Sequence, residues 1–335
     1  MLLPYLAIQT ALAGYGDAVD GVPSPEEREL HLWTNAVRVE PEAFSEFYDC
    51  GFESFTAHEQ TPQRPLLWQD GLGEAARFHT DDMVEADHFS HTSSDGTSFD
   101  ARVARYYEGM FIGENIAMGY ADPWQAVVVG WMCSSGHRAN IMSDFEELGT
   151  GVRGTWYTQD FGSRGVDLAE HALRLGAHSP VAPEETATLL TAFYDDAGAP
   201  PTTLSAVVNG QPHAMEIAFG TPDSGVFSID IEVSEACTTY FFEAERDNGT
   251  TVTFPEAGVY GFGDCAWVDP EAQWMYRDDD GFGYGDGGQS DAVNDDAPHR
   301  EWRKWPFGGC STTPQGPNTP LLFLLLFPLL ARRRS

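Results

Sequence analysis

The chain has 335 residues and a mass of 36.8 kDa, which is enough for about two domains of ordinary size. It contains 18 basic and 52 acidic residues, so its formal charge is −34, and a field of this sign repels the phosphate backbone of nucleic acids. We therefore expect no nucleic acid among its partners. Hydrophobic residues make up 42% of the chain, too many for a disordered protein, so the acidic residues decorate folded domains.

The first residues have the pattern of a leader. Residues Leu2–Ala13 are apolar and end in Ala11-Leu12-Ala13, an A-x-A pattern after which a signal peptidase cuts. We expect residues 1–13 to be a signal peptide and the protein to be exported. The alternative is that this stretch forms a buried first helix.

The next segment, residues 24–163, shows mixed helix and strand signals. A capping box at Ser24–Glu27, with proline at the first helical position, predicts a helix that starts at Ser24. Apolar residues spaced by three and four predict a second helix over 71–87, and Asp122-Pro123 predicts a third that runs through Trp131. Residues 148–161 are typical of two strands. This first domain is therefore predicted to be α+β.

Residues 180–270 show strand signals and almost no helical periodicity. Strand-like runs occur at 189–194, 225–233 and 239–245, separated by turn sequences. Asn209-Gly210 lies between two further short runs and is a strong hairpin signal. We expect a small all-β, immunoglobulin-like sandwich here. An acidic linker rich in Gly and Asp, a disordered stalk, is expected to follow at 276–309.

The last residues, 310–335, resemble a surface-sorting signal. Cys310 precedes a polar spacer, the apolar stretch Leu321–Ala331 and the cluster Arg332–Arg334, and this order is similar to the MYXO-CTERM signal of myxobacterial surface proteins. The resemblance implies that Cys310 is a processing and lipid-attachment site. The alternative is a plain C-terminal membrane anchor. Both place the folded body outside the cytoplasm.

The cysteine count fits an oxidising compartment. Without Cys310, the residues Cys50, Cys133, Cys237 and Cys265 remain, an even number that can pair in three ways. Pairing within each predicted domain joins Cys50 to Cys133 and Cys237 to Cys265. The alternative is that all four are buried free thiols.

Three short segments of the first domain supply polar residues that a fold could bring together. They provide His91, Glu114 and His137, two imidazoles and a carboxylate, which is the ligand set that zinc or another divalent metal takes with one position open. The same three groups could act as acid and base without a metal. Glu114 lies in an otherwise apolar stretch, so its burial requires a cationic or hydrogen-bond-donating partner. His79 lies on the second predicted helix and His88 lies at its end. Both are interpreted as structural.

Residues 25–162 resemble the CAP superfamily, also called the SCP domain, in its short bacterial form. The resemblance implies an α-β-α sandwich whose cleft holds a His and Glu cluster, here His91, Glu114 and His137. Many eukaryotic relatives have a second glutamate where this chain has Ser134, so we expect weak or conditional metal binding. The matching blocks, in chain order, are Asn35–Arg38, Phe89–Gly96, Gly113–Gly119, Trp131–Met142 and Tyr157–Gly162.

The sequence is compatible with two functions. The first, favoured by the resemblance, is an extracellular binding module for a lipid, a glycan or another protein. The second is a metal-dependent hydrolase of peptides or cell-envelope material that uses His91, Glu114 and His137. The missing second carboxylate counts against the hydrolase because it leaves no spare general base.

Overall fold

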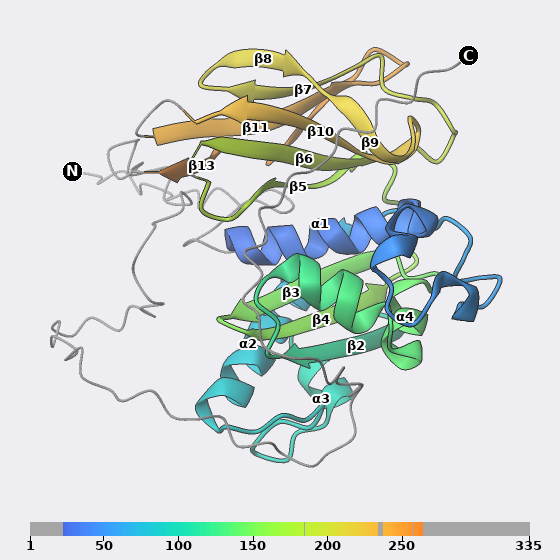
Figure 1. Ribbon diagram of the computed structural model, residues 1–335, viewed down its shortest axis with the longest axis vertical. Helices are drawn as coiled ribbons and strands as arrows, with labels where there is room; N and C mark the ends of the chain where they lie inside the picture. The colour runs from blue at the N-terminus through green and yellow to red at the C-terminus, as the bar shows by residue number, and fades with distance from the viewer. Residues whose placement is uncertain (1–22, 184, 234–236, 257, 264–335) are drawn as a thin grey trace, which may run out of the picture. The chain divides into compact units, whose positions relative to one another are not determined.

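The computed structural model describes residues 23–183, 185–233, 237–256 and 258–263, all of which belong to one compact unit (Figure 1). The expected signal peptide (1–13), the acidic linker (276–309) and the sorting segment with Cys310 lie outside these residues, as does Cys265. Within the described part, no helix combines the length and the apolar character needed to cross a bilayer.

The N-terminal part has the mixed composition of helix and strand expected from the sequence, and the α+β class is confirmed. The predicted first and second helices and the two predicted strands are present, and the third predicted helix is a π-helix. The helical elements are α1 (Pro25–Val39), η1 (Pro41–Phe47), η2 (Phe52–Ser54), α2 (Asp70–Glu85), α3 (Phe99–Val103), the π-helix η3 (Gln125–Trp131) and α4 (Ser135–Ile141). The strands are β1 (Leu67–Trp68), β2 (Phe111–Met118), β3 (Glu147–Arg153) and β4 (Trp156–Ser163).

These four strands form one sheet in the order β1-β3-β4-β2, with helices on both faces (Figure 1). Alternate residues of β3 identify the two faces. Thr150 donates a hydrogen bond of 2.8 Å to the carbonyl of Glu27 in α1, whereas Gly149 faces α2. A Cβ atom on Gly149 would lie 1.9 Å from the backbone nitrogen of Gly73, so only glycine lets α2 approach β3 this closely.

Helix α1 begins where its capping box predicts. The Ser24 side chain accepts from the Glu27 amide, and the Glu27 carboxylate accepts from the Ser24 amide at 2.8 Å. Every residue of α1 except Glu26 is buried, although the helix contains several charged side chains. Burial on one side alone would leave a polar face exposed, so a second layer must cover α1.

The second layer is the β-rich region, which consists of two antiparallel sheets. Its first strand starts at Leu173, before the position 180 expected from the sequence. The Asn209-Gly210 hairpin joins β7 to β8, and both turn residues have positive φ, at 48° and 77°. One sheet has the order β5-β6-β10-β9, and the other has the order β12-β11-β7-β8, with β13 also paired to β11. The strands are β5 (Leu173–Ser179), β6 (Thr186–Tyr194), β7 (Thr203–Val208), β8 (Gln211–Ala214), β9 (Glu216–Thr221), β10 (Ser224–Glu232), β11 (Cys237–Glu245), β12 (Thr251–Phe254) and β13 (Tyr260–Gly263).

Two apolar cores hold this arrangement. One lies between the two antiparallel sheets and includes Phe193 of β6 with Tyr240 and Phe242 of β11. The other surrounds α1 and includes residues of the helix together with Ala177 of β5 and Val226 of β10. Helix α1 therefore belongs to the core that joins the N-terminal part to the β-rich region.

A disulfide joins Cys50 to Cys133, as predicted, with the two Cα atoms 5.4 Å apart. It ties the η1–η2 segment to the residues that follow η3. The predicted pairing of Cys237 with Cys265 involves a residue outside the described part of the chain.

Candidate functional site

Glu114 lies in the middle of β2, on the face of the sheet that α2 covers. Its side chain is only 2% exposed. Strand alternation and register place Asp160 of β4 directly opposite. We call Glu114 and the four side chains around it, His79, His91, Arg102 and Asp160, the Glu114 cluster.

His91 reaches Glu114 from the loop that follows α2. Its Nδ1 lies 2.7 Å from Glu114 Oε1, and its side chain is 55% exposed. Because the carboxylate can only accept, Nδ1 carries the proton of this contact, and Nε2 is the ring nitrogen left for a further partner. The contact between His91 and Glu114, which the sequence suggested, is therefore present.

Arg102 is the partner that makes the burial of Glu114 possible. The Arg102 side chain comes from α3, is fully buried, and pairs through Nη2 with Glu114 Oε2. Its Nη1 group donates to the His91 carbonyl at 3.2 Å and to Ser93 Oγ at 3.0 Å. A cationic or donating partner for Glu114 was expected from the sequence, but Arg102 was not identified, because nothing in its local sequence marks it.

Two further ionisable groups lie behind Glu114. His79 Nε2, on the buried face of α2, lies 3.9 Å from Glu114 Oε2, and burial lowers the pKa of His79 to about 4, so this ring is neutral. Burial, and then the charge of Glu114, raise the pKa of Asp160 well above its usual value. Both causes favour the neutral form of the Asp160 carboxyl. An acidic residue inside a predicted strand was the available signal, but Asp160 was not selected from the sequence.

His137 lies on α4 and does not join Glu114 directly. Its ring packs edge-on against Trp131 with the ring centroids 6.5 Å apart. Burial, and then the neighbouring His91, lower the pKa of His137, so the ring is neutral. Among the described residues, no hydrogen bond or ion pair connects His137 to Glu114. Of the three residues singled out by sequence, the structure therefore brings two into contact and places the third beside His91.

Side chains on the opposite face of the sheet hold β2 in position. Asn115 donates to the His137 carbonyl at 3.2 Å and to Gln159 Oε1 at 3.0 Å. Asn140 Nδ2 donates to the Glu114 carbonyl at 3.0 Å, and Trp131 Nε1 donates to the Ile116 carbonyl at 3.1 Å. Because β2 is an edge strand, the bonds from Asn140 and Trp131 satisfy carbonyls of β2 that no further strand pairs with.

The donor set fits a metal ion only in part. No three His, Cys, Asp or Glu residues of the described chain are arranged as a metal-binding group. Glu114 does not fit as a ligand, because its two oxygens already bind His91 and the cationic Arg102. His91 does fit, because a carboxylate behind Nδ1 orients the ring and leaves Nε2 available, as behind many metal-bound histidines.

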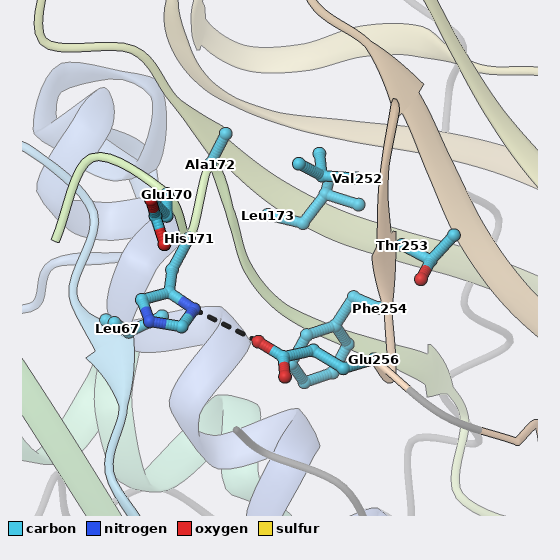
Figure 2. A pocket seen from close by; sticks show the side chains of 9 residues that line it. All are labelled: Leu67, Glu170, His171, Ala172, Leu173, Val252, Thr253, Phe254 and Glu256. Atoms are coloured by element: carbon cyan, nitrogen blue, oxygen red, sulfur yellow. Dashed lines mark hydrogen bonds and ion pairs between the residues drawn. The ribbon is translucent and has the colours of Figure 1, made fainter. Parts of the chain in front are cut away.

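A separate pocket of about 190 Å³ shares no residue with the Glu114 cluster (Figure 2). Its lining includes the apolar side chains of Leu67, Leu173 and Phe254, and Figure 2 shows His171 facing Glu256, with His171 Nδ1 3.1 Å from Glu256 Oε1. This pocket contributes nothing to the site around Glu114.

Comparison with known proteins identifies the class of the N-terminal part. Residues 34–164 match the family model of the cysteine-rich secretory protein family, CAP. This part of the chain is therefore a CAP domain, and the resemblance noted from the sequence is confirmed for it. The match covers neither the β-rich region nor the C-terminal segment.

Two curated proteins of Bacillus subtilis (strain 168) are similar to this chain. The uncharacterized membrane protein YlbC is 40% identical over 98 residues, which are 29% of this chain and 28% of that protein. The uncharacterized protein YkwD is 33% identical over 133 residues, which are 38% of this chain and 51% of that protein. The chain thus spans about half or less of the length of these relatives.

Among solved structures, this chain is similar to an extracellular protein of Bacillus anthracis str. Ames that contains an SCP domain, with 35% sequence identity. The match covers 30% of this chain and 34% of that chain, and its TM-score is 0.29. An outer surface protein of Borrelia burgdorferi is 24% identical, with 30% of this chain and 77% of that chain covered and a TM-score of 0.27.

Proposed function

We propose that this chain is a secreted, surface-anchored protein whose CAP domain is a non-catalytic binding module for a lipid, a glycan or an extracellular protein. The observation that supports this most directly is the state of Glu114. Both of its oxygens are engaged and its charge is balanced by Arg102. The second carboxyl, Asp160, is buried and its pKa is raised, so neither carboxyl group of the cluster is free to activate water.

The exposed surface beside the cluster supports a ligand with an apolar part. Phe89, two residues before His91, and Met118, on the same face of β2 as Glu114, are each 47% exposed. Trp156 pairs with Met118 across the sheet, and its ring centroid lies 6.0 Å from that of Phe89. Together they form a partly exposed apolar surface, and the loop that carries Phe89 also carries His91.

Weak binding of zinc or another divalent metal is part of the proposal. His91 would hold it through Nε2, with the neutral His137 as the neighbouring nitrogen ligand and Glu114 orienting His91 from behind. A metal bound in this way would polarise a ligand oxygen. This assignment moves Glu114 from the ligand set expected from the sequence to a supporting role.

The extracellular placement is supported by the disulfide between Cys50 and Cys133, a bond that persists in oxidising compartments. We propose that the signal peptide 1–13 directs export and that the segment with Cys310 anchors the protein to the cell surface. The β-rich region would act as an immunoglobulin-like spacer or adhesion domain.

A metal-dependent hydrolase is the alternative function. The observation in its favour is the oriented and exposed His91 ring, which is the kind of group that binds a catalytic metal. It requires a base that neither Glu114 nor Asp160 supplies in the observed arrangement.

Zinc titration of the full chain by calorimetry, with a broad peptidase and glycan-hydrolase screen, tests the proposal. We expect weak zinc binding that falls at least about tenfold in His91→Ala, and no turnover. The matched control is His88→Ala, which removes an exposed histidine near the same loop. Turnover that His91→Ala abolishes would establish the hydrolase instead. Absence of zinc binding in the unmodified chain would remove the metal from the proposal.

A second measurement addresses the ligand class. If the ligand is a lipid, phosphatidylcholine vesicles should retain the full chain, and Phe89→Ser should reduce that retention severalfold. Phe47→Ser is the control, because Phe47 is similarly exposed, at 42%, and is remote in sequence from His91. No vesicle binding would leave glycans and proteins as the ligand classes.

A further inference from the structure

The contact between α1 and strands β5, β6, β9 and β10, which we call the α1 joint, connects the CAP domain to the β-rich region (Figure 1). Near the end of α1, Glu40 Oε2 accepts a hydrogen bond of 3.0 Å from the Gly220 amide. The rings of Phe44 and Phe219 pack with centroids 4.9 Å apart. The joint is thus a packed interface and not a flexible tether.

An acidic side chain, Glu29, lies inside this joint. Its Oε1 accepts from Ser179 Oγ of β5 at 2.6 Å and from Trp33 Nε1 of α1 at 3.2 Å. Glu29 is only 5% exposed. The side chain therefore links the two halves of the joint from a position that water barely reaches.

The charged groups around Glu29 do not neutralise it. Its acidic neighbours are Glu26 on α1 and Asp122 just before η3. Arg28, the adjacent cation, donates instead to the Pro23 carbonyl at 2.7 Å and lies 3.9 Å above the Tyr260 ring of β13.

From β5, His178 is engaged by the Tyr240 hydroxyl of β11 at 2.8 Å and by the Val181 carbonyl at 2.9 Å. Burial lowers the pKa of His178 to about 3, so its ring is neutral. Among the described residues, no cation forms an ion pair with Glu29.

We propose that the α1 joint is a proton-sensitive contact, closed most tightly while Glu29 is a neutral carboxylic acid and loosened when Glu29 ionises. A neutral carboxyl can keep both observed hydrogen bonds at little cost. A carboxylate in the same place has lost most of its hydration and faces two acidic neighbours. Loosening the joint would expose the buried side of α1 and free the CAP domain to move relative to the β-rich region.

The direction of the effect follows from linkage. Burial is the largest cause that raises the pKa of Glu29, from 4.5 to about 7. Because the pKa of Glu29 is higher in the closed joint than in the open one, protonation of Glu29 stabilises the closed joint. This stabilisation is complete below about pH 4.5, declines as the pH rises from 4.5 to about 7, and is lost above about pH 7. The full span corresponds to at most about 300-fold in the closing equilibrium, and about fifty-fold is expected between about pH 5 and 7.5.

Hydrogen exchange of the full chain, followed by mass spectrometry and corrected for intrinsic rates, measures this change. Protection of the amides in β5 and α1 should fall by about fifty-fold between about pH 5 and 7.5. In Glu29→Gln the protection of β5 should vary less than about twofold over the same range. Glu26→Gln, the matched control on the same helix, should behave like the unmodified chain.

A second variant keeps the proposal testable if Glu29→Gln does not fold. Ser179→Ala removes a donor that favours the charged form of Glu29, so it should move the loss of protection to higher pH. A transition that stays in place or moves to lower pH in Ser179→Ala would overturn the proposal. The same holds if Glu29→Gln retains the pH dependence of the unmodified chain.

Discussion

Replacement of Arg102 by methionine tests whether one buried cation supports the whole Glu114 cluster. Arg102 is fully buried and forms the ion pair with Glu114 and two hydrogen bonds to the His91 loop. Methionine fills much of the same volume but leaves the carboxylate without a counter-ion. Breaking a buried pair in this way costs about 3–5 kcal/mol, so the free energy of unfolding should fall by that amount.

Urea unfolding, followed by tryptophan fluorescence and circular dichroism, measures the change. The matched control is Arg105→Met, because Arg105 is exposed and its side chain donates to Thr97 Oγ1 at the surface, so its loss should cost less than about 1 kcal/mol. Adding Glu114→Gln to Arg102→Met should recover more than about half of the loss, because it removes the unpaired charge. Equal losses for Arg102→Met and Arg105→Met would refute the idea that Arg102 balances Glu114.

Three further predictions concern the CAP domain. Replacement of Cys50 and Cys133 by serine opens a loop with a sequence separation of 83, so the free energy of unfolding should fall by up to about 4.5 kcal/mol. Urea unfolding of the variant and of the oxidised unmodified chain measures the difference. An unmodified chain that unfolds at the same urea concentration before and after reduction would contradict this prediction. Asp160→Asn removes a carboxyl whose pKa is raised by burial, so the unmodified chain should lose stability relative to the variant as the pH rises above about 4. Curves of unfolding free energy against pH that run parallel for the two chains from about pH 4 to 8 would show that the pKa of Asp160 is not raised. Gly149→Ala puts a methyl group 1.9 Å from the backbone of α2 and should lower the free energy of unfolding by about 3 kcal/mol or more. Gly136→Ala has open space around its Cβ atom and should change the melting temperature little. Similar melting temperatures for the two variants would be inconsistent with the close packing of α2 on β3.

Several features of the fold could be predicted because their causes are local in sequence. The capping box at Ser24 determines where α1 begins, and the Asn209-Gly210 pair determines a hairpin turn. The spacing of the apolar residues was sufficient to predict α2. Its predicted span of 71–87 differs from the observed helix by two residues or fewer at either end. β5 was missed, because the segment 173–179 has no turn signal or alternation strong enough to separate it from a loop.

The site was predictable to the extent that its residues lie in recognisable sequence blocks. His91 and Glu114 were selected in this way, and the structure places them in contact. His137 was selected by the same reasoning but lies beside His91 without bonding to Glu114. His79 was interpreted as structural, and its full burial on α2 agrees with that, although it also lies behind Glu114.

The amino-acid sequence alone indicated the class of the CAP domain and the start of α1, because each depends on residue types at short or characteristic spacings. It left three pairings of the four cysteines open, and the structure shows the one that joins Cys50 to Cys133. Only the tertiary structure decided that Arg102 pairs with Glu114, that burial raises the pKa of Asp160 and that Glu29 lies between two layers. The physical reason is that a charge acquires its energetic role from the groups packed around it. Those groups come from segments that are brought together only when the sheet, its helices and the β-rich region have assembled.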